Sequence, residues 1–291
     1  MKFIVISVIL SATLIGCKSS DSPSKNNKSS QETNQSMEKP VSSSGLDAPK
    51  QIVNNKDRAL AFCELISTKD SNSLSKFISS ELRMTNSPIG SNYSELKKFI
   101  TSKDINIIIQ PFRVGQMGNS VFVHSIYAGE TNTSAVDILT FEKGKIVNIE
   151  HFNDEYKQRN SMGVSTMDGE YKIQDVNKTG LHMGIVKSFM KKVAIDNSPN
   201  DISEGVNDDY IDRSSYIDGE SSSSLENRFV FDKISKTAFK FDYNSLERII
   251  AEGNFVLVES KATLNSEDVT VLDIFRMDRN RISEHWDVVS K

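Results

Sequence analysis

Three side chains near the carboxyl end of the sequence are able to carry out proton-transfer chemistry: Asp273, His285 and Asp287. They stand on two short apolar-polar alternating segments, which is the pattern of β-strands with one buried face. A carboxylate held against an apolar wall has a raised pKa, and this makes it a usable base near neutral pH. A structural alternative is favoured, in which Asp273 forms an ion pair with Arg276 or Arg281 that fixes the hairpin, and His285 is a partly buried histidine with its hydrogen bonds satisfied.

The two segments predict a hairpin whose pairing decides which side chains share a face. With a tight turn at Arg279-Asn280, Asp273 faces Trp286 and Phe275 faces Glu284 on one surface. The opposite surface then carries Ile274 with His285, and Leu272 with Asp287, unless a bulge moves Asp287. As the only tryptophan, Trp286 also suits a core position or a dimer contact.

Composition excludes several other kinds of site. The 291 residues contain 35 Lys+Arg and 39 Asp+Glu, so the chain lacks the positive field of a nucleic-acid binder. Two cysteines and four histidines are too few for a disulfide framework or a Cys-rich zinc module. The sequence has no Gly-rich phosphate loop and no H-E-x-x-H, and we expect no metal and no cofactor. Cys63 lies on an apolar helix stripe and is interpreted as a core residue.

An internal repeat organises the elements that must position these residues. Gly118-Asn119-Ser120-Val121-Phe122-Val123 matches Gly253-Asn254-Phe255-Val256-Leu257-Val258, and Val136-Asp137-Ile138-Leu139 matches Leu272-Asp273-Ile274-Phe275. The offset is about 136 residues throughout, so two similar units follow one another. Alternation predicts strands at 120–128, 135–141 and 146–152, and again at 255–264, 270–277 and 282–289. Gly144 and Asn280 suit the positive φ of hairpin turns.

Each unit begins with an amphipathic helix. In the second unit Leu181, Ile185, Phe189 and Val193 recur every four residues. In the first, Leu60, Cys63 and Ile66 form the stripe, and shorter helices are expected at 94–101 and from about Ser224. Helices followed by an antiparallel meander predict an α+β fold. The predicted segments are a signal peptide (1–16), a tether (17–51), the first unit (52–158), a linker (159–177) and the second unit (178–291).

The end of the second unit resembles a known family. Asp273-Ile274-Phe275-Arg276, a turn, and Glu284-His285-Trp286-Asp287 are similar to the two terminal strands of SnoaL-like proteins, a branch of the NTF2-like superfamily. The first unit looks like a diverged copy, with Glu150-His151-Phe152-Asn153 two residues further from its aspartate. The resemblance implies two tandem cones, each a strongly bent antiparallel sheet around helices. It also implies that one surface of the hairpin lines a pocket, whose predicted residues are Tyr210, Phe275, Glu284 and Trp286. In that pocket an acidic residue or a His–Asp pair moves a proton, with Tyr210 at the mouth polarising an oxygen.

One family feature differs in this chain. Many SnoaL-like sequences have a tyrosine followed by a segment like Q-H-N-P, whereas here Tyr210-Ile211 is followed by Asp212-Arg213-Ser214-Ser215. Arg213 stands where the histidine belongs. The difference favours a non-catalytic interpretation.

The first 17 residues resemble a bacterial lipoprotein signal. Lys2 precedes an apolar run, and Leu14-Ile15-Gly16-Cys17 resembles a lipobox. The resemblance implies lipidation of Cys17, with diacylglycerol and palmitate-type chains that hold the protein on a membrane of the cell envelope. Lys18 after the cysteine favours the outer membrane if the source is Gram-negative. The Ser-rich residues that follow cannot bury enough apolar surface to fold, and we interpret them as a spacer.

Three functions remain open from the sequence. The first is a membrane-anchored lipoprotein that binds a small apolar or amphipathic ligand or serves as an interaction module, with its two units pairing within the chain. The second is a SnoaL-like cyclase, isomerase or lyase that uses Asp273 or Asp287 as general base and His285 as partner. The third is a scaffold whose cones are filled by aromatic residues such as Phe229, Phe231 and Phe239.

Overall fold

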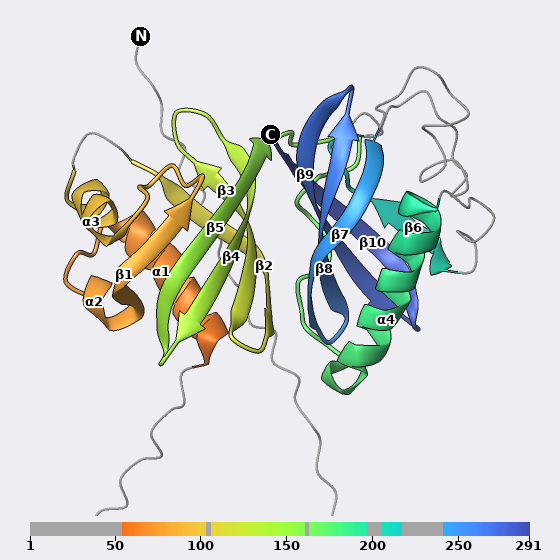
Figure 1. The fold of residues 1–291 in the computed structure, drawn as a ribbon, viewed down its shortest axis with the longest axis horizontal. Helices are drawn as coiled ribbons and strands as arrows, with labels where there is room; N and C mark the ends of the chain where they lie inside the picture. The colour runs from red at the N-terminus through yellow and green to blue at the C-terminus, as the bar shows by residue number, and fades with distance from the viewer. Residues whose placement is uncertain (1–53, 103–105, 161–162, 197–204, 217–240) are drawn as a thin grey trace, which may run out of the picture. The chain divides into compact units, whose positions relative to one another are not determined.

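The computed structural model describes residues 54–291 apart from 103–105, 161–162, 197–204 and 217–240 (Figure 1). The predicted signal peptide, Cys17, the tether, the helix from about Ser224 and the three aromatic residues of the scaffold interpretation lie outside the described residues. Within the described residues, no helix has the length and apolar character needed to cross a bilayer.

The first unit is a five-stranded sheet with three helices. Its order along the chain is α1 (Asn55–Thr68), α2 (Leu74–Phe77), β1 (Ile78–Thr85), α3 (Tyr93–Thr101), β2 (Ile108–Met117), β3 (Ser120–Ala128), β4 (Thr133–Glu142) and β5 (Lys145–Glu155). Strands β2 to β5 form an antiparallel meander, and β1 pairs in parallel with β5. Helix α1 begins at the Asn54 cap, whose side chain accepts from the Asp57 amide, and packs against β2 and β3.

The second unit repeats this arrangement. It contains η1 (Val176–Lys178), α4 (Thr179–Phe189), the π-helical η2 (Met190–Ile195), β6 (Val206–Asp212), β7 (Phe241–Glu252), β8 (Phe255–Leu264), β9 (Glu267–Asp278) and β10 (Arg281–Ser290). The sheet order β6-β10-β9-β8-β7 corresponds strand for strand to β1-β5-β4-β3-β2. The predicted α+β class, with helices against two bent sheets, is therefore confirmed; the parallel pairing of each first strand makes the sheets mixed rather than purely antiparallel.

The hairpin turns agree with the prediction and the helix stripes agree in part. Residues Lys143, Gly144, Arg279 and Asn280 all have positive φ, as two-residue turns between twisted strands require. Cys63 is buried on α1, as expected, but Leu60 is 41% exposed. Leu181 is 51% exposed, because His182 faces inward instead and bonds to the Gly253 carbonyl and the Asn280 side chain. The predicted inward positions of Leu60 and Leu181 are wrong.

Three apolar clusters account for most of the core. One fills the space between the first sheet and its helices, and a second lies between α4, η2 and the second sheet. The third joins side chains of β3, β4 and β5 to side chains of β7 to β10, and its largest member is Trp286, which is fully buried. An ion-pair cluster adds to this contact, because Arg248 binds Glu150 at 2.8 Å and Glu259 at 2.6 Å.

Candidate functional site

The terminal hairpin of the second unit has a different register from the predicted one. Asp273 pairs with Asp287, Ile274 with Trp286 and Phe275 with His285. The cause is a bulge at Ser283, which shifts the strand by one residue between Ile282 and Glu284. The predicted pairs of Asp273 with Trp286 and of Phe275 with Glu284 are therefore wrong, and so is the placement of Asp273 and His285 on opposite surfaces.

The three predicted catalytic residues come together on the inner face of the second sheet. His285 binds Asp273 through Nε2 at 2.9 Å and Asp212 of β6 through Nδ1 at 3.2 Å. The Tyr243 hydroxyl of β7 donates to both Asp273 oxygens at 3.2 Å. Within the described residues Asp273 forms no ion pair with Arg276 or Arg281, contrary to the structural alternative, and Arg276 binds Glu284 instead.

Two carboxylates determine the charge state of His285. Burial on its own lowers the pKa of a histidine, but Asp212 and Asp273 outweigh burial and hold the pKa of His285 well above its usual value. Because both ring nitrogens donate to carboxylates, His285 is an imidazolium at neutral pH. A ring in this state has no lone pair with which to accept a proton, so it links strands rather than serving as a base.

Asp287 has a different environment. Burial raises the pKa of this carboxyl group from 3.8 to about 6, against the opposing effects of His285 and of the Ser214 hydroxyl that donates to it. The Ser215 amide donates to its second oxygen at 3.2 Å. A carboxyl group with a pKa of about 6 is suited to general-base chemistry near neutrality.

The predicted pocket residues divide between two faces. Tyr210 and Phe275 lie in the inner apolar cluster, where the Phe275 ring stacks on His285 with centroids 4.9 Å apart. Trp286 and Glu284 lie on the other face of the sheet: Trp286 packs in the cluster between the sheets, and Glu284 binds Arg213 at 2.9 Å and Arg276 at 2.6 Å. The predicted pocket positions of Trp286 and Glu284 do not fit this placement. The bulge at Ser283 turns both side chains to the face of the sheet opposite His285.

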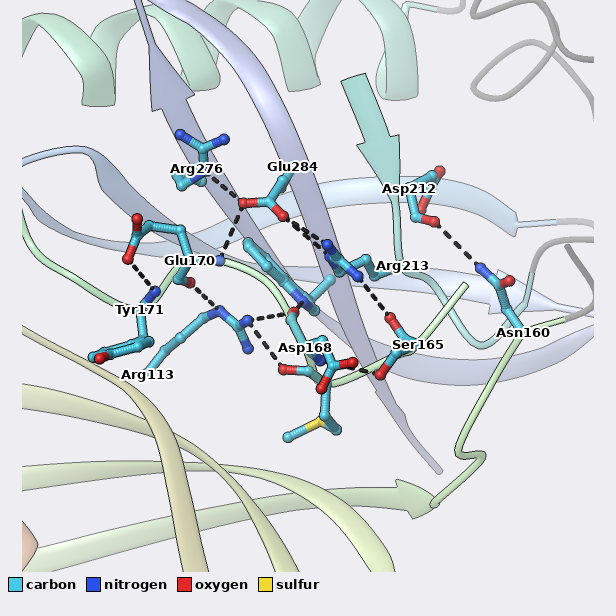
Figure 2. Close-up of polar contacts among 12 residues, drawn as sticks. Arg113, Asn160, Ser165, Asp168, Glu170, Tyr171, Asp212, Arg213, Arg276 and Glu284 are labelled. Carbon is cyan, nitrogen blue, oxygen red and sulfur yellow. Dashed lines mark hydrogen bonds and ion pairs between the residues drawn. The ribbon is translucent and has the colours of Figure 1, made fainter. Parts of the chain in front are cut away.

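Residues 165–171 of the predicted linker lie among these outward side chains (Figure 2). Arg113 of β2 donates to the carbonyl oxygens of Met167, Asp168 and Glu170 at 3.1, 2.6 and 3.0 Å, and its guanidinium lies 3.6 Å from the Trp286 ring. Burial lowers the pKa of Arg113 to about 9, which leaves it charged at neutral pH. Arg213 stands where the resemblance to SnoaL-like sequences predicts a histidine. It joins this cluster by donating to the Glu284 carboxylate and to the Ser165 carbonyl.

The first unit contains a site that the sequence did not reveal. His151 of β5 binds Asp137 of β4 through Nδ1 at 2.8 Å, and the Tyr127 hydroxyl of β3 donates to the second Asp137 oxygen at 2.8 Å. All three side chains are buried, and His151 and Tyr127 line a cavity of about 880 Å³. Residues at its rim include Asn86, Asn106 and Asn153.

The difference between the two units follows from their sequences. In the first unit His151 lies directly across from Asp137, whereas in the second unit Asp287 occupies the position opposite Asp273. The two-residue displacement of Glu150-His151-Phe152-Asn153 was the available signal for this pairing. Because Nδ1–H of His151 donates to a carboxylate, the ring is held as the tautomer whose Nε2 is an acceptor. An imidazole in this state binds a ligand hydroxyl or removes a proton.

The sequence matches no protein-family model and no curated protein. Solved structures with a similar course of the chain include a SnoaL-like polyketide cyclase from Agrobacterium tumefaciens, with 12% identity, a TM-score of 0.30, and coverage of 34% of this chain and 91% of that one. An NTF2-like protein of unknown function from Cytophaga hutchinsonii has 17% identity, a TM-score of 0.33 and coverage of 37% and 95%. An LEH-like epoxide hydrolase from M. tuberculosis has 12% identity, a TM-score of 0.32 and coverage of 34% and 82%.

Proposed function

We propose that the protein is a lipoprotein of the bacterial cell envelope that binds a small amphipathic ligand in the cavity of its first unit. One observation carries the binding proposal. His151, which is hydrogen-bonded to Asp137, lines a cavity of about 880 Å³. This volume is in the range of small-molecule sites, which spans roughly 300–1,000 Å³. Tyr127 and Ile107 offer apolar contact, while His151 offers an acceptor to a ligand hydroxyl.

The membrane anchor in this proposal rests on the sequence around Cys17. Two or three acyl chains give stable attachment, because each buried methylene contributes about 0.8 kcal/mol. Growth of an expressing bacterium with labelled palmitate tests this part. We expect label on the wild-type chain and none on Cys17→Ser, and an unlabelled wild-type chain would refute the anchor without touching the cavity.

Comparative metabolite extraction tests the binding site. The full chain, His151→Gln and the matched control His182→Gln are purified from membranes in parallel, and their bound compounds are identified by mass spectrometry. His182 is a buried histidine that bonds to the Gly253 carbonyl and does not line the cavity. We expect one compound to accompany the wild type and the control but not His151→Gln. Equal recovery from all three proteins would refute the proposal.

A second function is proton-transfer catalysis by the same histidine, as in an isomerase or lyase. The Asp137–His151 pair favours it, because the carboxylate that accepts from Nδ1–H fixes the orientation of a ring that lines the cavity. Asp287, with its pKa of about 6, is the corresponding candidate base of the second unit. The recovered compound is incubated with each protein in D₂O. Deuterium uptake that requires His151 supports catalysis in the first unit, uptake that requires Asp287 supports the second unit, and no uptake leaves binding alone.

A further inference from the structure

A second cavity adjoins the His151 cavity. It has a volume of about 770 Å³ and is lined by the ends of β4 and β5, by Tyr216, and by the last residues of β10. Thr131, Thr133 and Asn153 line both cavities, so the two adjoin at the end of the sheet where β4 begins and β5 ends. A ligand bound at His151 therefore has room to extend past Asn153 toward side chains of the second unit.

Many of the side chains that line the two cavities are polar. Small-molecule sites are mostly apolar, with a few polar groups that set orientation. Here the side-chain amides of Asn86, Asn106, Asn132 and Asn153 are accompanied by the hydroxyls of threonine and tyrosine residues. Each amide offers a donor and an acceptor side by side. An adjacent donor and acceptor can form hydrogen bonds with two neighbouring hydroxyl groups of a sugar ring, whereas a hydrocarbon offers no partner for either.

Two tyrosines add aromatic surface to the second cavity. Tyr216 and Tyr156 both line it, and the Tyr216 hydroxyl donates to Asp154 at 2.5 Å, which orients the ring. Burial, followed by the bond to Asp154, raises the pKa of Tyr216, so the hydroxyl stays protonated. Aromatic rings present an apolar face with a polar edge, and this suits a ligand with the same two characters.

The charge of the lining selects against anions. Glu130, Asp154 and Glu155 contribute carboxylates. The nearby ammonium groups already have partners: Lys291 pairs with Glu267 at 2.5 Å, and Lys157 bonds to the Ser215 carbonyl and lies 5.3 Å from the Tyr216 ring centroid. A phosphate or carboxylate in this place meets like charges, and a neutral ligand does not.

We propose that the two cavities form one extended site for an uncharged, polyhydroxylated chain, that is, an oligosaccharide. The inference rests on the proposed ligand-binding function and adds the class of the ligand. One sugar hydroxyl bonds to His151, and the following sugars run past Asn153 and contact Tyr156 and Tyr216. Affinity then increases with chain length until both cavities are filled.

Calorimetric titration of the full chain tests the proposal. The probes are three oligosaccharide series, each from monomer to pentamer: β-1,4-linked N-acetylglucosamine, β-1,4-linked glucose and α-1,4-linked glucose. We expect at least one series to bind with an affinity that increases tenfold or more with length. Tyr156→Ala removes that gain and leaves the binding of the shortest member unchanged. Tyr171→Ala, which alters a 69% exposed tyrosine that lines neither cavity, behaves as the wild type.

The outcomes separate the two proposals. If no series binds at millimolar concentration while the extraction experiment yields a compound that depends on His151, the oligosaccharide inference is refuted and the binding site stands. If sugars bind but neither His151→Gln nor Tyr156→Ala weakens them, the assignment of the two cavities is refuted. A length-independent affinity also refutes it, because only one cavity is then occupied.

Discussion

Replacement of His285 by glutamine tests the charge arrangement inside the second sheet. The imidazolium separates two buried carboxylates, Asp212 and Asp273, at 3.2 and 2.9 Å. Breaking a buried ion pair by removing one partner costs about 3–5 kcal/mol, because the remaining charge is left without compensation. We expect His285→Gln to lower the free energy of unfolding at pH 6.5 by this amount, as measured by urea denaturation.

The pH dependence gives a sharper form of this prediction. Since the native pKa of His285 is raised, its stabilisation is complete below the unfolded pKa of about 6.5 and is lost as pH increases toward the native pKa. The loss amounts to about 1.4 kcal/mol per pH unit, or up to about 2.8 kcal/mol between pH 6.5 and 8.5. Asp287, with a pKa of about 6, and Arg113, with a pKa of about 9, titrate at the margins of this window.

The assay compares three pH profiles of the free energy of unfolding: wild type, His285→Gln and His182→Gln. We expect the wild type and the control to decline with increasing pH and His285→Gln to decline less. Parallel profiles for wild type and His285→Gln would refute the reasoning. If the variant does not fold, an NMR titration of the wild type replaces it. Ring-proton chemical shifts showing that His285 becomes neutral below pH 7 would contradict the assignment of an imidazolium.

Three further predictions concern other buried side chains. Asp287→Asn should increase the free energy of unfolding at pH 7.5 by about 3 kcal/mol and leave it unchanged at pH 3.5, because the raised native pKa imposes a cost of ionisation that accumulates between pH 3.8 and pH 6; urea denaturation at the two pH values measures this. Trp286→Ala should cost about 3–5 kcal/mol in the same assay, since it opens the cluster between the sheets and removes the contact with Arg113. Cys63, whose thiol pKa is raised by burial, should react with maleimide at pH 8 only after denaturation, and rapid labelling of the native protein would contradict its position.

The sequence predicted the strands whose apolar residues alternate regularly. Strands β3 and β8 have the bounds expected, because each has both faces covered and begins directly after a Gly-Asn turn, at Gly118-Asn119 and Gly253-Asn254. Strands β1, β2, β6 and β7 were missed. In β7 two register shifts, after Tyr243 and after Leu246, interrupt the alternation, and in β2 a shift follows Pro111. A period-two search does not detect a strand with such breaks.

The candidate site was predicted only in part for a related reason. The grouping of Asp273, His285 and Asp287 follows from their placement on paired strands, but the bulge at Ser283 determines which of them face each other. A one-residue shift exchanges the two faces of a strand, and nothing in the local sequence specifies it. The Asp137–His151 pair was not predicted, because the first unit differs from the SnoaL-like sequence motif. The spacing of these two residues along the hairpin nevertheless places them directly opposite each other.

The parallel pairing of the first and last strands has a consequence for how each unit folds. β5 lies between β1 and β4, and β10 lies between β6 and β9, so the strand made last occupies an interior position. The contacts of β1 with β5 span more than sixty residues, for example Ile78 with Ile146. Until the last strand arrives, the edge of β4 or β9 remains unpaired and open to association with other chains. Long-range closure of this kind slows folding, and a nascent unit therefore passes through a stage at which an unpaired strand edge is open to association.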